Sequence, residues 1–269
     1  MITLKQYYRQ SATYKILRGM LRQFGSFLDT LGKITRNGIE TAKYIFHGQI
    51  RWNEVIEQCR RFGISSLPIT LSIVSMTTII VSSQVANEMV KQGGGSFVGM
   101  LLTILIVREL GVIMSGFAII SMIGSSLASE IATMRVTEQI DAIEVLKVNP
   151  IQYLFVPRVL SGIIMMPVVL IIASVVGVLA GAVSSNLASG LSYISYFDSM
   201  WLGIYMKDLF VSILKAVCFG GTIALISCSC GYYASGGAKG VGQATTKAVV
   251  WSFVAIVIWD MFFAIAFFF

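Results

Sequence analysis

The chain has 269 residues, of which 56% are hydrophobic and only 12% are charged, and its formal net charge is +7. Soluble domains carry about 25% charged residues, so this composition excludes a soluble globular fold for most of the chain and predicts a membrane protein. Eleven of the twenty lysines and arginines lie in residues 1–61, before the first long apolar run. This clustering disfavours nucleic-acid binding and favours a basic segment beside an anionic membrane leaflet.

Residues 1–64 form a mixed segment that we expect to lie at the membrane surface rather than to cross the bilayer. Apolar residues recur there at helical spacing and basic residues lie off that stripe, which predicts an amphipathic interfacial helix. The stripe consists of Leu17, Met20, Leu21, Phe24, Phe27, Leu28 and Leu31, and the basic residues are Lys15, Arg18 and Arg22. A soluble helical cap whose stripe faces its own core is the alternative.

Residues 65–269 contain the long apolar segments and predict an all-α membrane domain with five transmembrane helices. We place these spans at 65–88, 96–128, 150–187, 208–233 and 245–268. With the N-terminus in the cytoplasm, the inner connections hold Arg135, Lys147, Lys239 and Lys247, whereas the outer ones hold Lys91 and Lys207. The positive-inside rule therefore predicts a cytoplasmic N-terminus and a cytoplasmic 129–149 segment.

Arg108 and Glu109 interrupt the second predicted span. Charges inside a membrane are costly, and they usually face a cavity or a partner. Adjacent residues on a helix do not face each other, so each side chain should reach a different group. Two interpretations stay open here, namely a polar lining for a lipid headgroup or gate, and structural ion pairs with other helices.

Lys215 and Asp260 are the other charges within the predicted spans. Counted from the outer ends of their helices, each lies about eight residues deep, which is about 12 Å along a helix. Equal depth and opposite sign predict a structural ion pair between the fourth and fifth spans. Such a pair would leave neither charge alone in lipid.

The cytoplasmic segment 129–149 has the pattern of an acidic amphipathic helix. Ile131, Met134, Ile140 and Ile143 keep helical spacing, and the acidic residues are Glu130, Glu138, Asp141 and Glu144. Anionic headgroups repel an acidic helix, so a groove on a protein partner explains the pattern better than a lipid surface. A solvated loop helix without a partner is the alternative.

A face of small residues marks the third span, where Gly177 and Gly181 are in step with Ala173 and Ser185. Such a face lets two helices approach closely, either within the chain or across a dimer.

Catalytic and metal-binding patterns are not apparent in the sequence. The lone His47 cannot complete a Ser-His-Asp set or a metal site, and Cys228 and Cys230 point to different sides of a helix. The chain also lacks the Gly-x-x-x-x-Gly-Lys-Ser/Thr phosphate loop. We therefore expect no catalytic residue, no metal site and no cofactor in this chain, and any ATP hydrolysis would come from another polypeptide.

Several motifs in order resemble the MlaE-type permease family of lipid ABC transporters. They include Val107-Arg108-Glu109-Leu110-Gly111, Gly124-Ser125, Met134-Arg135-Val136-Thr137-Glu138-Gln139-Ile140-Asp141, Asn149-Pro150, Val156-Pro157-Arg158 and Gly240-Val241-Gly242. The resemblance covers about residues 100–262. Met122 stands where many members of that family have arginine.

This resemblance implies a homodimeric permease that moves phospholipid between the inner and outer membranes of bacteria. It implies a multi-pass protein of the bacterial inner membrane, with two cytoplasmic ATPase subunits that bind ATP and Mg²⁺ and a periplasmic ring of MCE-domain protein. A lipid cavity between two copies would be lined by Arg108, Glu109, Val85, Met89 and Leu105. The ATPase would contact a coupling helix at Glu130, Met134, Arg135, Glu138 and Asp141.

Two other functional classes remain as alternatives. The first is an ion- or proton-coupled secondary transporter that uses Glu109 and Asp260 as relay groups. The second is a membrane scaffold without transport, in which the intramembrane charges are only structural. The sequence shows no inverted repeat of the kind that favours secondary transporters, and neither class explains the acidic segment at 129–149.

Overall fold

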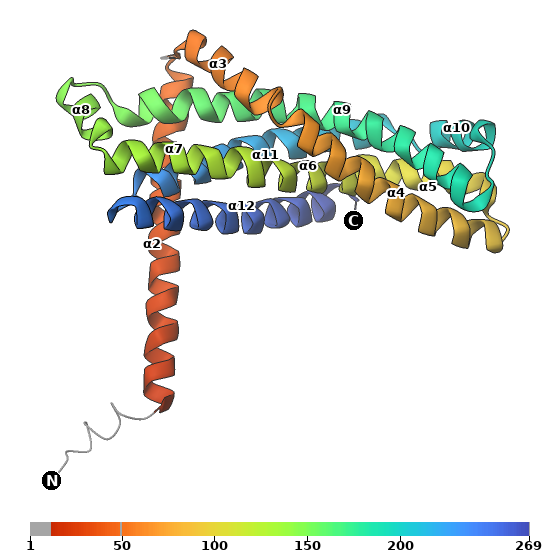
Figure 1. The fold of residues 1–269 in the computed structure, drawn as a ribbon, viewed down its shortest axis with the longest axis horizontal. Helices are drawn as coiled ribbons and strands as arrows, with labels where there is room; N and C mark the ends of the chain where they lie inside the picture. Colours follow the sequence, from red (N-terminus) through yellow and green to blue (C-terminus); the bar gives the residue numbers. More distant parts are fainter. Residues whose placement is uncertain (1–11, 49, 269) are drawn as a thin grey trace.

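The computed structural model describes residues 12–48 and 50–268, and this part of the chain is helical without strands (Figure 1). The first helices are α2 (Ala12–Phe46), α3 (Trp52–Gly63), α4 (Leu67–Lys91), η1 (Gly95–Phe97), α5 (Val98–Leu105), η2 (Ile106–Leu110) and α6 (Gly111–Ile119). Those that follow are η3 (Ile120–Gly124), α7 (Ser125–Val136), α8 (Gln139–Val145), η4 (Ile151–Phe155), α9 (Val156–Ser189), α10 (Tyr193–Leu202), α11 (Met206–Tyr232) and α12 (Gly237–Phe268).

Five helical stretches of the described residues are long and apolar enough to cross a membrane, which confirms the predicted number of spans. They are Trp52–Lys91, Gly95–Val136, Ile151–Ser189, Met206–Tyr232 and Gly237–Phe268. The fifth begins at Gly237 rather than at residue 245, because the glycine-rich segment forms its first turns. Only Gly236 and Gly237 have the left-handed backbone of a turn there, with φ of 91° and 68°.

The bundle is held together by close helix crossings at glycines. A Cβ atom on Gly162 of α9 would lie 2.5 Å from the carbonyl oxygen of Gly220 on α11, so the two backbones touch at this point. Around the crossing lies an apolar core that includes Phe62, Val112, Ile120, Met166, Phe219 and Ile223. Small residues permit such approaches in a membrane, where van der Waals packing drives helix association.

The small-residue face of α9 packs against α4 of the same chain. The sequence had left open whether this face meets a helix of the same chain or of a second copy. A Cβ on Gly177 would lie 3.3 Å from Thr78 Oγ1, and one on Gly181 would lie 2.9 Å from Ser82 Oγ. Near these glycines, Ser184 Oγ donates a hydrogen bond to the carbonyl of Ile79 at 2.7 Å. This face is therefore occupied within the chain.

Helix α2 runs across the spans at a steep angle near the end of the bundle that carries α8 (Figure 1). Asn37 of α2 is buried, donates to Ser229 Oγ at 3.2 Å and accepts from the Tyr233 hydroxyl at 3.3 Å. The rest of α2 extends beyond the bundle. Of the predicted apolar stripe, the side chains of Leu17, Met20, Leu21, Phe24 and Phe27 lie outside the described residues, as do all of residues 1–11. Leu28 and Leu31 are exposed.

The prediction of one coupling helix over 129–149 is wrong. Helix α7 continues the second span to Val136, and the short helix α8 begins again at Gln139. Glu138 adopts the left-handed conformation at φ 60°, which a continuous right-handed helix cannot contain. The β-branched Val136 and Thr137 precede the break and are weak helix formers, so the chain turns there into a helical hairpin, α7–α8.

The Gly162–Gly220 crossing predicts a specific stability effect. We expect Gly162→Ala to lower the free energy of unfolding by roughly 1–3 kcal/mol, because the added methyl group overpacks the contact with Gly220. Thermal unfolding of the purified protein in detergent measures this change. Gly242→Ala is the control, because a Cβ there meets nothing within 4 Å, and it should leave stability unchanged or higher. An equal loss of stability in both variants would contradict the explanation that Gly162 is needed for close contact with Gly220.

Candidate functional site

A cluster of charged side chains lies inside the membrane-spanning region, centred on Lys215. The Lys215 side chain is fully buried, and its Nζ lies 2.7 Å from Asp260 Oδ1 and 3.3 Å from both carboxylate oxygens of Glu109. The same ammonium donates to the backbone carbonyl of Arg108 at 3.0 Å. The structure thus brings together Lys215 and Asp260, which the sequence paired, and adds Glu109 as a third member.

The second span widens at this point into a π-helical turn, η2, that contains Arg108 and Glu109. Such π-turns inside α-helices are frequent at functional sites. Although the two residues are adjacent, they reach different partners on α11, because Glu109 contacts Lys215 and Arg108 contacts Asp208. A single turn of the second span therefore holds two separate ion pairs.

Arg108 is one of the two most exposed members of the cluster, with Glu109 as the other. Its Nη2 lies 2.9 Å from Asp208 Oδ2, and its guanidinium carbon lies 4.5 Å from the ring centre of Phe268. The contact with Asp208 is an ion pair without hydrogen-bond alignment. Arg108 Nε and Asp208 Oδ2 are both buried without a hydrogen-bond partner among the described residues. The Arg108 side chain remains 30% exposed, so it can accept a further anionic partner.

The sequence did not point to Asp208 as a site residue, because Asp208 lies at the boundary of the fourth span, where a charge does not indicate a functional site. Its side chain is nevertheless only 3% exposed. The signal that could have found it is the spacing of seven residues to Lys215, which places both on one face of a helix. With Asp208 included, the cluster holds two cations and three carboxylates.

An apolar groove of ≈ 480 Å³ lies beside the charged cluster. It is lined by parts of α5, η2, α9, α10 and α11, including Val107, Ser174, Phe197, Trp201 and Leu209. Val107 directly precedes Arg108, and Leu209 directly follows Asp208, so the groove and the cluster share two backbone segments. A long apolar groove next to a guanidinium can receive an acyl chain and a phosphate at the same time.

Helix α10 contributes part of the lining of the groove and is held by a buried tyrosine. Tyr196 packs with Ala86, Val98, Leu102 and Ala182, and its hydroxyl donates to the carbonyl of Val178 at 3.3 Å. Burial raises the pKa of the Tyr196 phenol to about 12, so it remains a donor at neutral pH.

The remaining residues predicted to line a lipid cavity lie away from this groove. Val85 and Met89 of α4 pack, partly buried, against the apolar cluster around Tyr196. Leu105 is half-buried at the end of α5, immediately before the π-turn. None of the three is among the residues that line the ≈ 480 Å³ groove, whose existence depends on α10 and could not be foreseen from spans alone.

Glu130 joins three helices at the base of the α7–α8 hairpin. Its carboxylate accepts a hydrogen bond from Arg158 Nη2 on α9 at 2.6 Å and from Arg61 Nη1 on α3 at 3.3 Å. Arg158 is almost fully buried and also donates to the carbonyl of Leu154. This trio fixes the hairpin to the first and third spans, so Glu130 is occupied within the chain.

The other predicted coupling residues divide into internal and surface positions. Arg135 forms an ion pair with Asp141 at 2.6 Å, which closes the hairpin, and Met134 packs against the buried cluster that contains Ile131 and Ile140. Glu138 is exposed at the turn. At the C-terminal end of α8, Val145 and the following Leu146 are 81% and 74% exposed, which leaves an apolar end on an otherwise acidic hairpin.

Comparisons with known proteins agree with this architecture. Residues 55–266 match the family described as Permease MlaE. A probable ABC transporter permease protein of Synechocystis sp. is 36% identical over 81% of this chain and 83% of its own length. A probable ABC transporter permease protein of Rickettsia conorii is 33% identical over 91% and 95%. Protein TRIGALACTOSYLDIACYLGLYCEROL 1, chloroplastic, of Arabidopsis thaliana is 34% identical over 80% and 62%.

These matches cover most of the chain, including all five spans and the α7–α8 hairpin. The relatives named as permease proteins are transport components rather than catalysts. The chain therefore belongs to the MlaE permease family and is a multi-pass permease subunit of the ABC transporter type.

Proposed function

We propose that this permease moves phospholipid between the inner and outer membranes of a bacterial envelope. The observation that carries the proposal is the partly exposed Arg108 guanidinium, which lies beside an apolar groove of ≈ 480 Å³ within the spans. A phospholipid has a phosphate for the first and acyl chains for the second. The Arg108 guanidinium is partly exposed and can donate hydrogen bonds to a phosphate. A relative named after a diacylglycerol lipid also supports a lipid substrate.

The proposed assembly is a homodimer in the bacterial inner membrane. Two ATPase subunits bind ATP and Mg²⁺ on the cytoplasmic side, because this chain carries no phosphate loop, and an MCE-domain ring lies on the outer side. The lipid cavity forms between two copies, with Glu109, Val85, Met89 and Leu105 along the walls that the first and second spans contribute. A chloroplast protein among the relatives indicates that the same architecture also serves other membranes.

Coupling is proposed to run through the α7–α8 hairpin. The exposed Val145 and Leu146, with Glu138 at the turn, offer an ATPase subunit an apolar contact with an acidic rim. Force on the hairpin reaches the first and third spans through Glu130, which contacts both Arg61 and Arg158. It reaches the second span directly, since α7 is the continuation of that span.

A secondary transporter that uses Glu109 and Asp260 as relay groups is less well supported. Both carboxylates already share the buried Lys215 ammonium, at 3.3 Å and 2.7 Å. Such sharing favours a structural function for the two carboxylates, while Arg108 is the partly exposed cation that an anionic headgroup can contact.

Arg108→Gln should slow lipid transport about tenfold or more, because the loss of one charge-assisted hydrogen bond to phosphate costs roughly 1.5–3 kcal/mol. The measurement is ATP-driven movement of a fluorescent phospholipid in vesicles that contain the permease with its ATPase. Arg108→Lys keeps the charge and should retain part of the rate, while Lys91→Gln removes an exposed charge elsewhere and should have no effect. Full transport by folded Arg108→Gln would refute the assignment.

Lys215→Met should lower the free energy of unfolding by roughly 3–5 kcal/mol, because it strands two carboxylates inside the spans. Thermal unfolding in detergent tests this, with Lys91→Met as the control. Lys91 has the same side chain and forms an exposed pair with Glu88, worth at most about 1 kcal/mol. A similar loss in both variants would mean that the buried cluster does not stabilise the bundle.

Replacing Val145 and Leu146 with aspartate should abolish co-purification of the ATPase, because two charges then occupy the apolar contact. The spans should stay folded, since both side chains are exposed. Ile194→Asp is the matched control: Ile194 is 74% exposed on α10, at the opposite end of the bundle, and its change should leave the ATPase bound. Undiminished co-purification with the altered hairpin would exclude it as the coupling element.

A further inference from the structure

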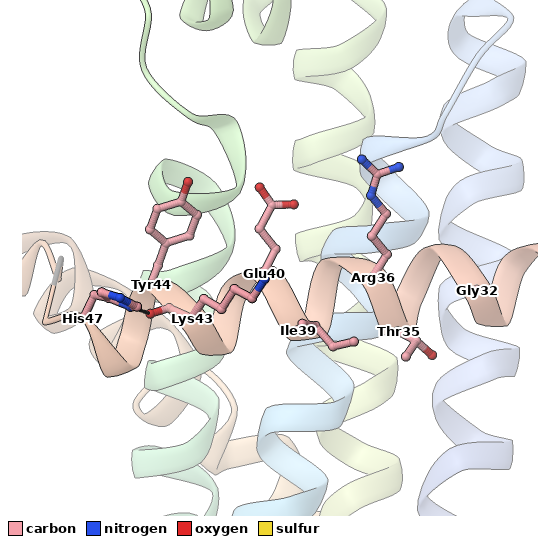
Figure 2. A pocket seen from close by; sticks show the side chains of 8 residues that line it. All are labelled: Gly32, Thr35, Arg36, Ile39, Glu40, Lys43, Tyr44 and His47. Carbon is pink, nitrogen blue, oxygen red and sulfur yellow. Dashed lines mark hydrogen bonds between the residues drawn. The ribbon is translucent and has the colours of Figure 1, made fainter.

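Helix α2 carries a groove of ≈ 800 Å³ that the transport mechanism does not use (Figure 2). The residues that line it belong to α2 and to the turn that follows it, and they include three side chains that can carry positive charge, Arg36, Lys43 and His47. Figure 2 shows Arg36 and Glu40 extending from one side of the helix, whereas Ile39 lies on the other. The groove therefore combines basic and apolar walls along one helix.

The position of α2 on the bundle places these walls at defined angles. Asn37 and Thr41 are buried against the spans. At about 100° per residue, Ile39 and Phe46 lie on the side of the helix opposite to Asn37, and they are 56% and 89% exposed. We expect an exposed apolar side that points away from the bundle, on a helix that crosses the spans near their ends, to contact lipid.

The basic side chains lie between the lipid-facing side and the turn that follows the α7–α8 hairpin. Glu40 accepts a hydrogen bond from Asn149 Nδ2 at 3.3 Å, and the Tyr44 hydroxyl accepts from the same group at 2.8 Å. Asn149 stands at the end of the hairpin, where its Oδ1 accepts from the Ile151 backbone amide at 2.8 Å. This side of α2 therefore lies against the segment that follows the α7–α8 hairpin.

Arg36 and Lys43 are available to a ligand. Both are exposed, and among residues 12–48 and 50–268 neither side-chain cation forms an ion pair or a hydrogen bond. They are seven residues apart, which is about 10 Å along the axis, so their long side chains can converge on one anion from two sides. The single carboxylate between them, Glu40, is already engaged by Asn149.

We propose that the α2 groove binds the headgroup of an anionic phospholipid from the membrane leaflet that contains α2. Arg36 and Lys43 contact the phosphate, and the acyl chains lie along Ile39 and Phe46. The apolar wall favours a lipid over free phosphate, which needs no such wall, and over an acidic protein, which would have to displace lipid from Ile39 and Phe46. This site differs from the transport cavity, because it lies on the outside of the bundle and involves none of the intramembrane charges.

The test is native mass spectrometry of the full chain in mild detergent, titrated with phosphatidylglycerol and, separately, with phosphatidylcholine. We expect Arg36→Gln with Lys43→Gln to weaken phosphatidylglycerol binding about thirtyfold, at about 1 kcal/mol for each basic residue near an anionic headgroup. Binding of phosphatidylcholine should be weak and should change little. Arg36→Lys with Lys43→Arg keeps both charges and should bind phosphatidylglycerol as the unaltered chain does.

Lys239→Gln with Lys247→Gln is the matched control, because it removes two exposed lysines from α12 and should preserve binding. Equal weakening in this control would show that only net charge matters and would overturn the site. Competition by soluble glycerol phosphate as strong as that by the lipid would indicate a free-phosphate site instead. If the Arg36 and Lys43 variant binds lipid as the unaltered chain does but no longer binds the ATPase, the groove is a contact for that protein instead of a lipid site. Each of these experiments measures binding and not transport, so the α2 site can be tested even if the transport proposal fails.

Discussion

The burial of one ammonium group, that of Lys215, constrains this structure most. A charge in the hydrocarbon region is stable only with partners, and Lys215 obtains them from two other spans, Glu109 on η2 and Asp260 on α12. Three of the five spans are thereby fixed at one depth and in one rotation about their axes. The same turn of η2 that supplies Glu109 also directs Arg108 to Asp208, so the position of the Arg108–Asp208 pair depends on that of the Lys215–Glu109 pair.

Close packing at small residues complements this charged centre. Burial of apolar surface gives little drive between helices in lipid, so the spans associate through backbone approach and short polar contacts. Gly162 meets Gly220 between α9 and α11, and Gly177 and Gly181 meet Thr78 and Ser82 between α9 and α4. Helix α9 is therefore rigidly packed on two sides, whereas the side that faces α10 and α11 keeps the apolar groove.

Features that depend on the position of residues along the helices could be predicted from the sequence. Hydropathy located the five spans, and depth counting paired Lys215 with Asp260. Features that depend on how helices approach one another could not be predicted in this way. The burial of Asp208 and the groove beside α10 both arise from tertiary contacts. Periodicity assigned residues 129–149 to one helix because a left-handed residue at a turn does not disturb the apolar pattern on either side.

The connections of the α7–α8 hairpin determine what a movement of this hairpin would displace. At its base Glu130 contacts Arg61 and Arg158, and at its end Asn149 contacts Glu40 and Tyr44 of α2. Because Arg158 is buried, separating it from Glu130 would cost more than separating the exposed Arg61. The hairpin and α9 should therefore move as one body, while the contacts with α3 and α2 yield first. A change in the position of α3 is transmitted to α4, since both belong to the first span. That span is one of the two proposed walls of the lipid cavity, so the hairpin displaces this wall only as long as the contact between Glu130 and Arg61 holds.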